Sequence, residues 1–122
     1  MARVIGIGGV FMRTGAPDDL RAWYSRVLGL TFEEWGGIAF PPLDRGVTVF
    51  SPFSLDTDYF RPSTRDFMVN FVVDDLDAML ARVNKEGVAT LGRDDSDPSG
   101  RFAWIMDPAG VKIELWQAKA GK

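Results

Sequence analysis

Cysteine and histidine are both missing from this chain of 122 residues. Without cysteine there can be no disulfides, thiolate metal sites or cysteine nucleophiles, and the composition is compatible with a reducing cytoplasm. Without histidine the commonest metal ligand and the commonest general base are gone. Any chemistry must therefore come from carboxylates, amines, hydroxyls, amides or the rings of aromatic residues.

The sequence also lacks a block of basic residues and a long apolar run. Its net charge of -3 argues against a nucleic-acid surface, and no run of apolar residues is long enough to cross a bilayer or to serve as a signal peptide. A hydrophobic content of 46% is ample for one compact core. We expect a cytoplasmic protein with a single domain over residues 1–122, and with neither nucleic acid nor membrane as a partner.

The first half of the chain has the pattern of strand, helix and three short strands. Apolar spacing at i, i+3, i+4, i+7 and i+8 predicts a helix within 15–29, which begins near Pro17 and ends at Gly29. Strands are predicted at 3–12, 30–35, 38–40 and 47–53.

A polar linker of about residues 54–66 follows. It is rich in Ser, Pro, Asp and Thr, and the aromatic residues Phe53, Tyr59 and Phe60 lie in it or at its start. These rings either cover the edge of the core or form a lid over a cleft.

After the linker the same order of elements begins again. A strand is predicted at 68–73, a helix between Asp75 and Gly87, a strand at 88–91, a polar loop at 93–100 and a hairpin at 102–117. The chain is thus two βαβββ modules, about 1–53 and about 67–118, and each module is too small to bury its sheet alone. In the last strand, Glu114 is expected on the face opposite Ile113 and Leu115.

These features resemble the vicinal oxygen chelate superfamily, which includes glyoxalase I, extradiol dioxygenases and bleomycin-resistance proteins. The resemblance covers nearly the whole chain and is carried by the βαβββ repeat and by short motifs at 22–24, 27–30, 72–77, 107–110 and 113–116. It implies an α+β fold in which the two modules form a curved mixed sheet with the helices on its convex side. The fold hosts several reactions as well as plain ligand capture, so it does not identify the substrate.

The resemblance also implies where a metal would bind. In metal-dependent members the ion lies in the cup of the sheet, at positions that fall here on Gly9, Phe50, Met68 and Glu114. Only Glu114 offers a ligand for a hard cation, and Asn70 adds one amide. We therefore expect no metal and no other cofactor.

Without a metal, the cup would be a mainly apolar cavity that binds a small, partly aromatic or apolar molecule. Its other predicted lining residues are Phe11, Phe50, Met68, Asn70, Trp104 and Trp116, with Tyr59 at the rim. Arg101 is predicted to bind the ligand as well, and in an enzyme either Asn70 or Arg101 would stabilise a developing oxyanion. One alternative is a metal-free isomerase, epimerase or lyase that uses Glu114 as its acid–base group, and another is a metal-dependent enzyme with unusual ligands. A third is a stress or partner-binding domain in which side chains fill the cup.

The resemblance implies a homodimer as well. The open edge of each sheet needs a cover, and Phe53, Tyr59 and Phe60 are more aromatic than a solvated loop requires. We expect the linker or the first strand to form the two-fold interface.

Overall fold

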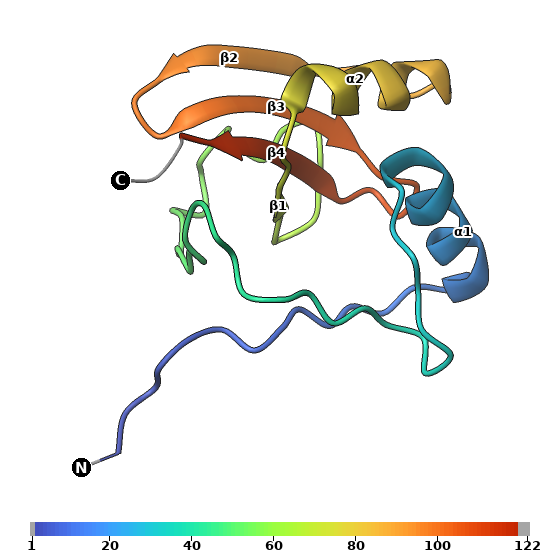
Figure 1. Cartoon of the computed structure of the whole chain (residues 1–122), viewed down its shortest axis with the longest axis horizontal. Helices are drawn as coiled ribbons and strands as arrows, with labels where there is room; N and C mark the ends of the chain where they lie inside the picture. The colour runs from blue at the N-terminus through green and yellow to red at the C-terminus, as the bar shows by residue number, and fades with distance from the viewer. Residues whose placement is uncertain (1, 120–122) are drawn as a thin grey trace.

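The computed structural model describes residues 2–119 and shows an α+β fold. Two helices lie on one face of a four-stranded mixed sheet, as Figure 1 shows. Helix α1 spans Pro17–Leu28 and α2 spans Leu76–Lys85. The strands are β1 (Val69–Val72), β2 (Gly92–Asp97), β3 (Gly100–Met106) and β4 (Lys112–Ala118).

The sheet has the order β1-β4-β3-β2, in which β1 runs parallel to β4 and the other pairs are antiparallel. The register aligns Asn70 of β1 and Trp104 of β3 with Glu114 of β4. Side chains of opposed residues point to the same face of a sheet, so these three form one cross-strand row. The next row joins Val72, Trp116 and Phe102.

Local features of the sequence set both helices. The predicted first helix is confirmed: Pro17 stands in its first turn, and Gly29 ends it with a φ of 77° that favours glycine. In α2 the side chain of Asp75 caps the N-terminus by accepting a hydrogen bond from the amide of Ala78 at 3.0 Å.

The core lies between the helices and the sheet. Strand alternation places Ile113 and Leu115 of β4 in it with no exposed surface, as predicted. Tyr24 of α1 joins them and donates a hydrogen bond of 2.6 Å to the buried carboxylate of Asp107 in the turn between β3 and β4. That carboxylate also accepts from the amides of Ala109 and Val111, so one side chain holds both the turn and the helix.

The predicted polar loop at 93–100 is wrong, because most of it is the edge strand β2. The strand predicted at 88–91 is likewise not assigned, and pairing with β3 begins at Gly92. Arg93 and Asp95 form ion pairs there, and Arg93 also reaches Asp77 of α2 at 2.6 Å. Because ion pairs and backbone hydrogen bonds stabilise this strand, it does not need the apolar alternation by which strands are recognised in a sequence.

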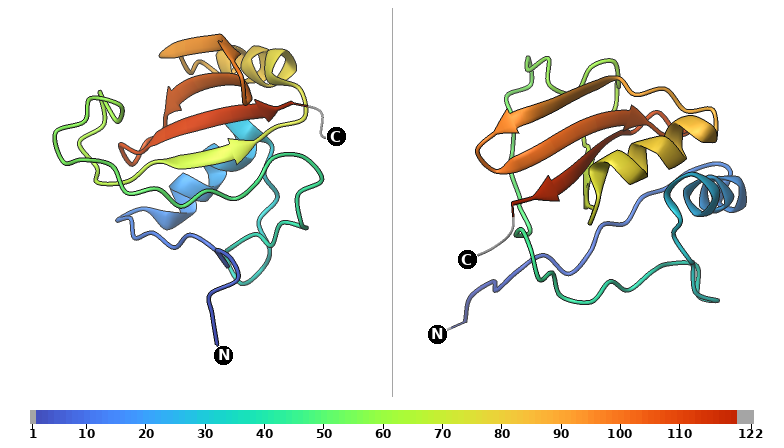
Figure 2. Two further views of the ribbon diagram at one scale, coloured as in Figure 1. Left: turned by 90° about the vertical axis from the view of Figure 1, so that its left-hand side faces the viewer. Right: turned by 45° about the horizontal axis from the view of Figure 1, so that its top comes forward.

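The strand ranges predicted in the first half, 3–12, 30–35, 38–40 and 47–53, are not strands in the structure. Figures 1 and 2 show them as open chain that runs from the N-terminus to α1 and from α1 to the linker, away from β2 and β3. Their apolar alternation is suited to a sheet, but a strand also needs a hydrogen-bonding neighbour. Within the described residues none pairs with them, and Ile5 and Phe11 remain 88% and 95% exposed.

Neither helix of the described chain is both long enough and apolar enough to cross a membrane.

Candidate functional site

The candidate site lies on the sheet face opposite the helices, here called the cup face. Alternation places Phe102, Trp104 and Met106 of β3 on this face, next to Lys112, Glu114 and Trp116 of β4. The rings of Trp104, Phe102 and Trp116 lie nearly parallel, with centroids 6.4 and 5.8 Å apart and interplanar angles of 11° and 4°. The cup face therefore presents a row of three aligned rings.

Glu114 lies beside this row and accepts three hydrogen bonds. Its Oε1 accepts from the amide of Asn70 at 2.6 Å, and its Oε2 accepts from the indole N–H of Trp104 at 2.8 Å. The hydroxyl of Tyr59 also donates to Oε2. Among the described residues no lysine or arginine forms an ion pair with this carboxylate. Neutral donors thus hold an anionic group among aromatic rings.

Tyr59 reaches Glu114 from the linker. Its ring meets Trp104 edge-on, with centroids 6.1 Å apart at 88°, and Phe53 stacks on it at 5.5 Å. Burial, followed by the hydrogen bond to Glu114, raises the pKa of the Tyr59 hydroxyl. The phenol consequently keeps its proton at neutral pH and acts as a donor to the carboxylate.

Lys112 is a site residue that the sequence analysis did not select. Its Nζ donates to the backbone oxygen of Tyr59 at 2.7 Å and lies 5.4 Å from the centroid of the Tyr59 ring and 5.7 Å from that of Trp104. Loss of water around it lowers the pKa of this amine, while Glu114 acts in the opposite direction. Lys112 lies two residues before Glu114 on the same strand, and this spacing predicts that both side chains lie on the same face of the sheet.

The linker is fastened to the sheet beyond Tyr59 as well. Arg65 donates from Nε to the carbonyl of Ala109 at 2.9 Å, and Ser63 donates to the carbonyl of Gly110 at 2.5 Å. The linker therefore lies across one end of the cup face.

The structure brings together Tyr59, Asn70, Trp104 and Glu114 from the predicted set, and Trp116 lies at the far end of the ring row, beyond Phe102. Met68 directly precedes β1 and is partly buried. Trp116 is 8% exposed and its indole donates to Ser99. A Cβ added to Gly46 would lie 3.2 Å from the Trp116 ring, so the first half of the chain touches the row here.

Three predicted residues lie elsewhere. Arg101 is on the helix side of β3, where it pairs with Asp77 at 2.9 Å and Asp95 at 3.2 Å. Phe50 is 79% exposed. Phe11 lines a hollow of about 310 Å³ near the β3–β4 turn, whose other lining residues are Met12, Arg13, Arg65, Phe67, Ala109 and Val111.

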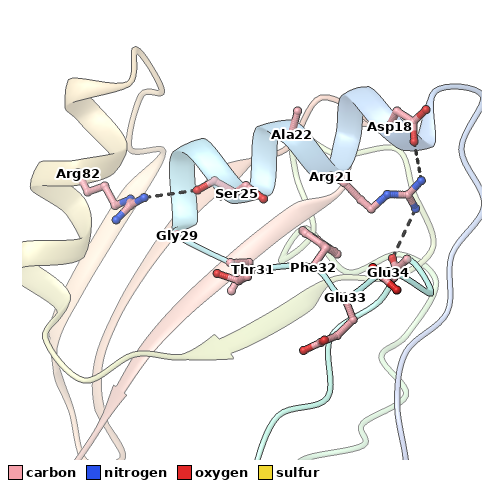
Figure 3. Close-up of a pocket in the computed structure, with 12 residues that line it drawn as sticks. Asp18, Arg21, Ala22, Ser25, Gly29, Thr31, Phe32, Glu33, Glu34 and Arg82 are labelled. Atoms are coloured by element: carbon pink, nitrogen blue, oxygen red, sulfur yellow. Dashed lines mark hydrogen bonds and ion pairs between the residues drawn. The ribbon is translucent and has the colours of Figure 1, made fainter.

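A larger open hollow of about 760 Å³ lies between α1 and residues 29–36, as Figure 3 shows, and none of the predicted site residues lines it. Two arginines at its edges hold backbone carbonyls. Arg21 donates to Gly36, and Arg82 of α2 donates to Ser25 and Arg26 at the end of α1. At this hollow, polar contacts connect the two helices with each other and with the segment that follows α1.

The residues at the family's metal positions do not fit a metal ion. Gly9 and Phe50 lie outside the sheet and supply no donor atom, and Met68 offers only a thioether. Glu114 supplies a single carboxylate, and of its neighbours the indole N–H of Trp104 cannot act as a metal ligand. Within residues 2–119 no group of three or more acidic side chains is placed to hold a metal.

The chain belongs to the Glyoxalase/Bleomycin resistance protein/Dioxygenase superfamily, whose model matches residues 6–115. This confirms the resemblance stated from the sequence. No curated protein matches the chain significantly.

Two solved structures that match nearly the whole chain have the same fold. TnmS3, an antibiotic binding protein from Streptomyces sp. CB03234, is 23% identical over 98% of this chain and 100% of that chain, with a TM-score of 0.61. A putative glyoxalase family protein from Bacillus anthracis is 20% identical over 98% and 100%, with a TM-score of 0.58. A glyoxalase/bleomycin resistance protein from Streptomyces sp. CB03234 is 38% identical, but the match covers only 41% of this chain and 45% of that chain, with a TM-score of 0.37.

Proposed function

We propose that this protein binds a small, planar and partly aromatic molecule on the cup face, without a metal ion. The partly buried rings of Trp104 and Phe102 would supply contact area, and Glu114 would fix the orientation through a hydrogen-bonding or cationic group of the ligand. The observation that carries the proposal is the carboxylate of Glu114, held among rings by neutral donors only.

The burial of the two faces of the sheet supports this use. On the helix face Ile113 and Leu115 are fully buried, whereas on the cup face Phe102, Trp104 and Glu114 are only partly buried. Large rings that the core does not need are typical of a binding surface. TnmS3 is described as an antibiotic binding protein; that role belongs to TnmS3, and it indicates that a protein of this fold can bind an antibiotic.

Acid–base catalysis by Glu114 has less support. Both oxygens of the carboxylate already accept hydrogen bonds, and the raised pKa of Tyr59 keeps the proton on the phenol. This arrangement suits recognition better than proton transfer.

Tryptophan fluorescence tests the proposal directly, because Trp104 and Trp116 lie on the cup face. We expect 1-naphthol and 1-naphthylamine to quench the emission saturably, and the anion 1-naphthalenesulfonate to bind at least about 10-fold more weakly beside Glu114. Trp35 is 70% exposed, so a Trp35→Phe background removes non-specific quenching. Saturable binding that is lost in Trp104→Phe, and unchanged by EDTA, is the expected result. Equal binding of all three probes would contradict the proposal.

We further propose that the protein is a homodimer. The aromatic residues of the linker pack on the cup face of their own chain, so the first strand region is the better candidate for the interface. In this region, residues 3–12, Val4, Val10 and Phe11 are 90%, 62% and 95% exposed. Strand β1, at the edge of the sheet, also has one side without a neighbouring strand among the described residues. A second copy would cover apolar surface that a lone chain leaves in water. Light scattering should give twice the single-chain mass of 13.5 kDa, and a mass of one chain would contradict the proposal.

A further inference from the structure

We propose that the Glu114 end of the cup face is a phenol-recognition subsite, which Tyr59 fills in the free protein and a phenolic ring of the ligand replaces. This inference rests on the proposed function and names the chemical class of the ligand.

The first step is the set of contacts around the Tyr59 ring. Its hydroxyl donates to Glu114, its edge meets Trp104, and the ammonium of Lys112 lies 5.4 Å from its centroid. Each contact addresses a feature that any phenol has, namely an O–H donor, an aromatic edge and a π face. None of these contacts depends on the backbone of Tyr59, so a free phenol could make all three.

The second step is the way in which the linker carries Tyr59. Between residues 54 and 63 the hydrogen bonds from one backbone group to another form local turns, from Thr57 to Ser54, from Arg61 to Asp58 and from Ser63 to Phe60. Leu55 in this stretch is 98% exposed. A segment that bonds mainly to itself can move as a unit with little loss of internal bonding.

The third step is that few bonds hold this segment on the cup face. Tyr59 supplies the hydroxyl that binds Glu114 and the carbonyl that accepts from Lys112. The bonds of Ser63 and Arg65 to the β3–β4 turn lie beyond it and can stay in place as an anchor. Replacement of Tyr59 by a ligand therefore exchanges one phenol for another at Glu114 and leaves the anchor intact.

A competing side chain lowers the apparent affinity of a ligand for its site. The affinity for phenols should consequently rise when Tyr59 is shortened. The variants are Tyr59→Ala, which vacates the subsite, and Tyr59→Phe, which keeps the ring but removes the bond to Glu114. The probes are p-cresol, which matches the tyrosine side chain, and toluene, which has the same shape without the hydroxyl.

We expect p-cresol to bind Tyr59→Ala at least about 10-fold more tightly than it binds the wild type, with Tyr59→Phe between them. Toluene should bind Tyr59→Ala at least about 10-fold more weakly than p-cresol does. The preference for p-cresol should disappear in Tyr59→Ala/Glu114→Gln/Asn70→Ala, which removes the charged acceptor and one of its supports. Quenching of Trp104 and the shift in melting temperature report binding in each case.

Equal binding of p-cresol and toluene to Tyr59→Ala would overturn the inference, because the vacated space would then be an apolar hole. That result leaves the proposed function intact if the wild type still binds 1-naphthol. Binding of p-cresol to Tyr59→Ala together with no binding of 1-naphthol to the wild type would overturn the replacement step and the proposed function together. If Tyr59→Ala does not fold, Tyr59→Phe decides, and an affinity for p-cresol no higher than that of the wild type overturns the inference.

Discussion

The two halves of this chain have the same predicted order of elements, yet within residues 2–119 only the second half forms strands that pair into a sheet. In the second half Ile113 and Leu115 have no exposed surface, whereas in the first half Phe11 and Phe50 are 95% and 79% exposed. Both halves form their helix. A helix satisfies its backbone within one segment, while a strand depends on a neighbour.

The helix of the first half is in fact part of the core of the second. Tyr24 of α1 bonds to Asp107, its ring lies 6.1 Å from that of Phe71 of β1, and Arg82 of α2 reaches the carbonyls of Ser25 and Arg26. The described core therefore has one sheet, with one helix from each half.

The largest effect should come from an apolar truncation in the second half. Ile113→Ala removes a fully buried side chain and should lower the free energy of unfolding by about 3 kcal/mol. The matched change in the first half, Phe50→Ala, should cost less than about 0.5 kcal/mol at the lowest protein concentration. Urea unfolding at two concentrations measures both. If both variants lost the same free energy of unfolding at low protein concentration, the contrast between the halves would be wrong. A loss for Phe50→Ala that grows with protein concentration would indicate that a second copy of the chain covers Phe50.

A smaller effect is expected at the junction of the halves. Asp107→Ala removes the acceptor for Tyr24 and for the amides of Ala109 and Val111, all at a buried position. The free energy of unfolding should fall by about 2 kcal/mol, because buried donors lose their partner. Asp107→Asn keeps an acceptor oxygen and should cost less. A cost for both variants below about 0.5 kcal/mol would mean that α1 does not depend on this turn.

The smallest effect concerns the polar edge strand. Hydrogen bonds from Arg93 and then Arg101 lower the pKa of Asp77, and Arg93 first of all lowers that of Asp95. Carboxylates with a lowered folded-state pKa stabilise the fold above their ordinary value of 3.8, and this contribution is lost as the pH falls through the folded value. The groups are exposed, so the loss should be small. The free energy of unfolding in urea should differ less between pH 6 and pH 3 for Asp77→Asn than for the wild type. An equal difference in both proteins would exclude these ion pairs as a cause of the pH dependence.

Much of the fold could be predicted because its determinants are local. Apolar spacing, Asp75 and Gly29 define the helices, and alternation placed Ile113 and Glu114 on opposite faces of β4. Strand β2 was missed because polar residues in ion pairs hold it. The first-half strands were predicted from alternation, which reports a preference for a sheet and not the presence of a neighbour.

The candidate site was predictable in part. Asn70 and Glu114 follow from alternation and the repeat, and the same alternation, counted from Trp104, would have placed Arg101 on the other face. The path of the linker could not be predicted, because Tyr59 and Glu114 are 55 positions apart and no local pattern relates them. Lys112 was overlooked because a lysine on a strand usually faces water.

The hydrogen bond between Tyr24 and Asp107 also bears on the order in which the chain folds during synthesis, since it joins residues 83 positions apart. Synthesis proceeds from the N-terminus, so α1 leaves the ribosome long before the turn that receives it. Until that turn emerges, the apolar stripe of Leu20, Trp23 and Val27 has no sheet to cover. Contacts of such long separation are slow to form, and the docking of α1 is therefore a late step that the nascent chain must await. During this interval the apolar stripe of α1 stays exposed to solvent.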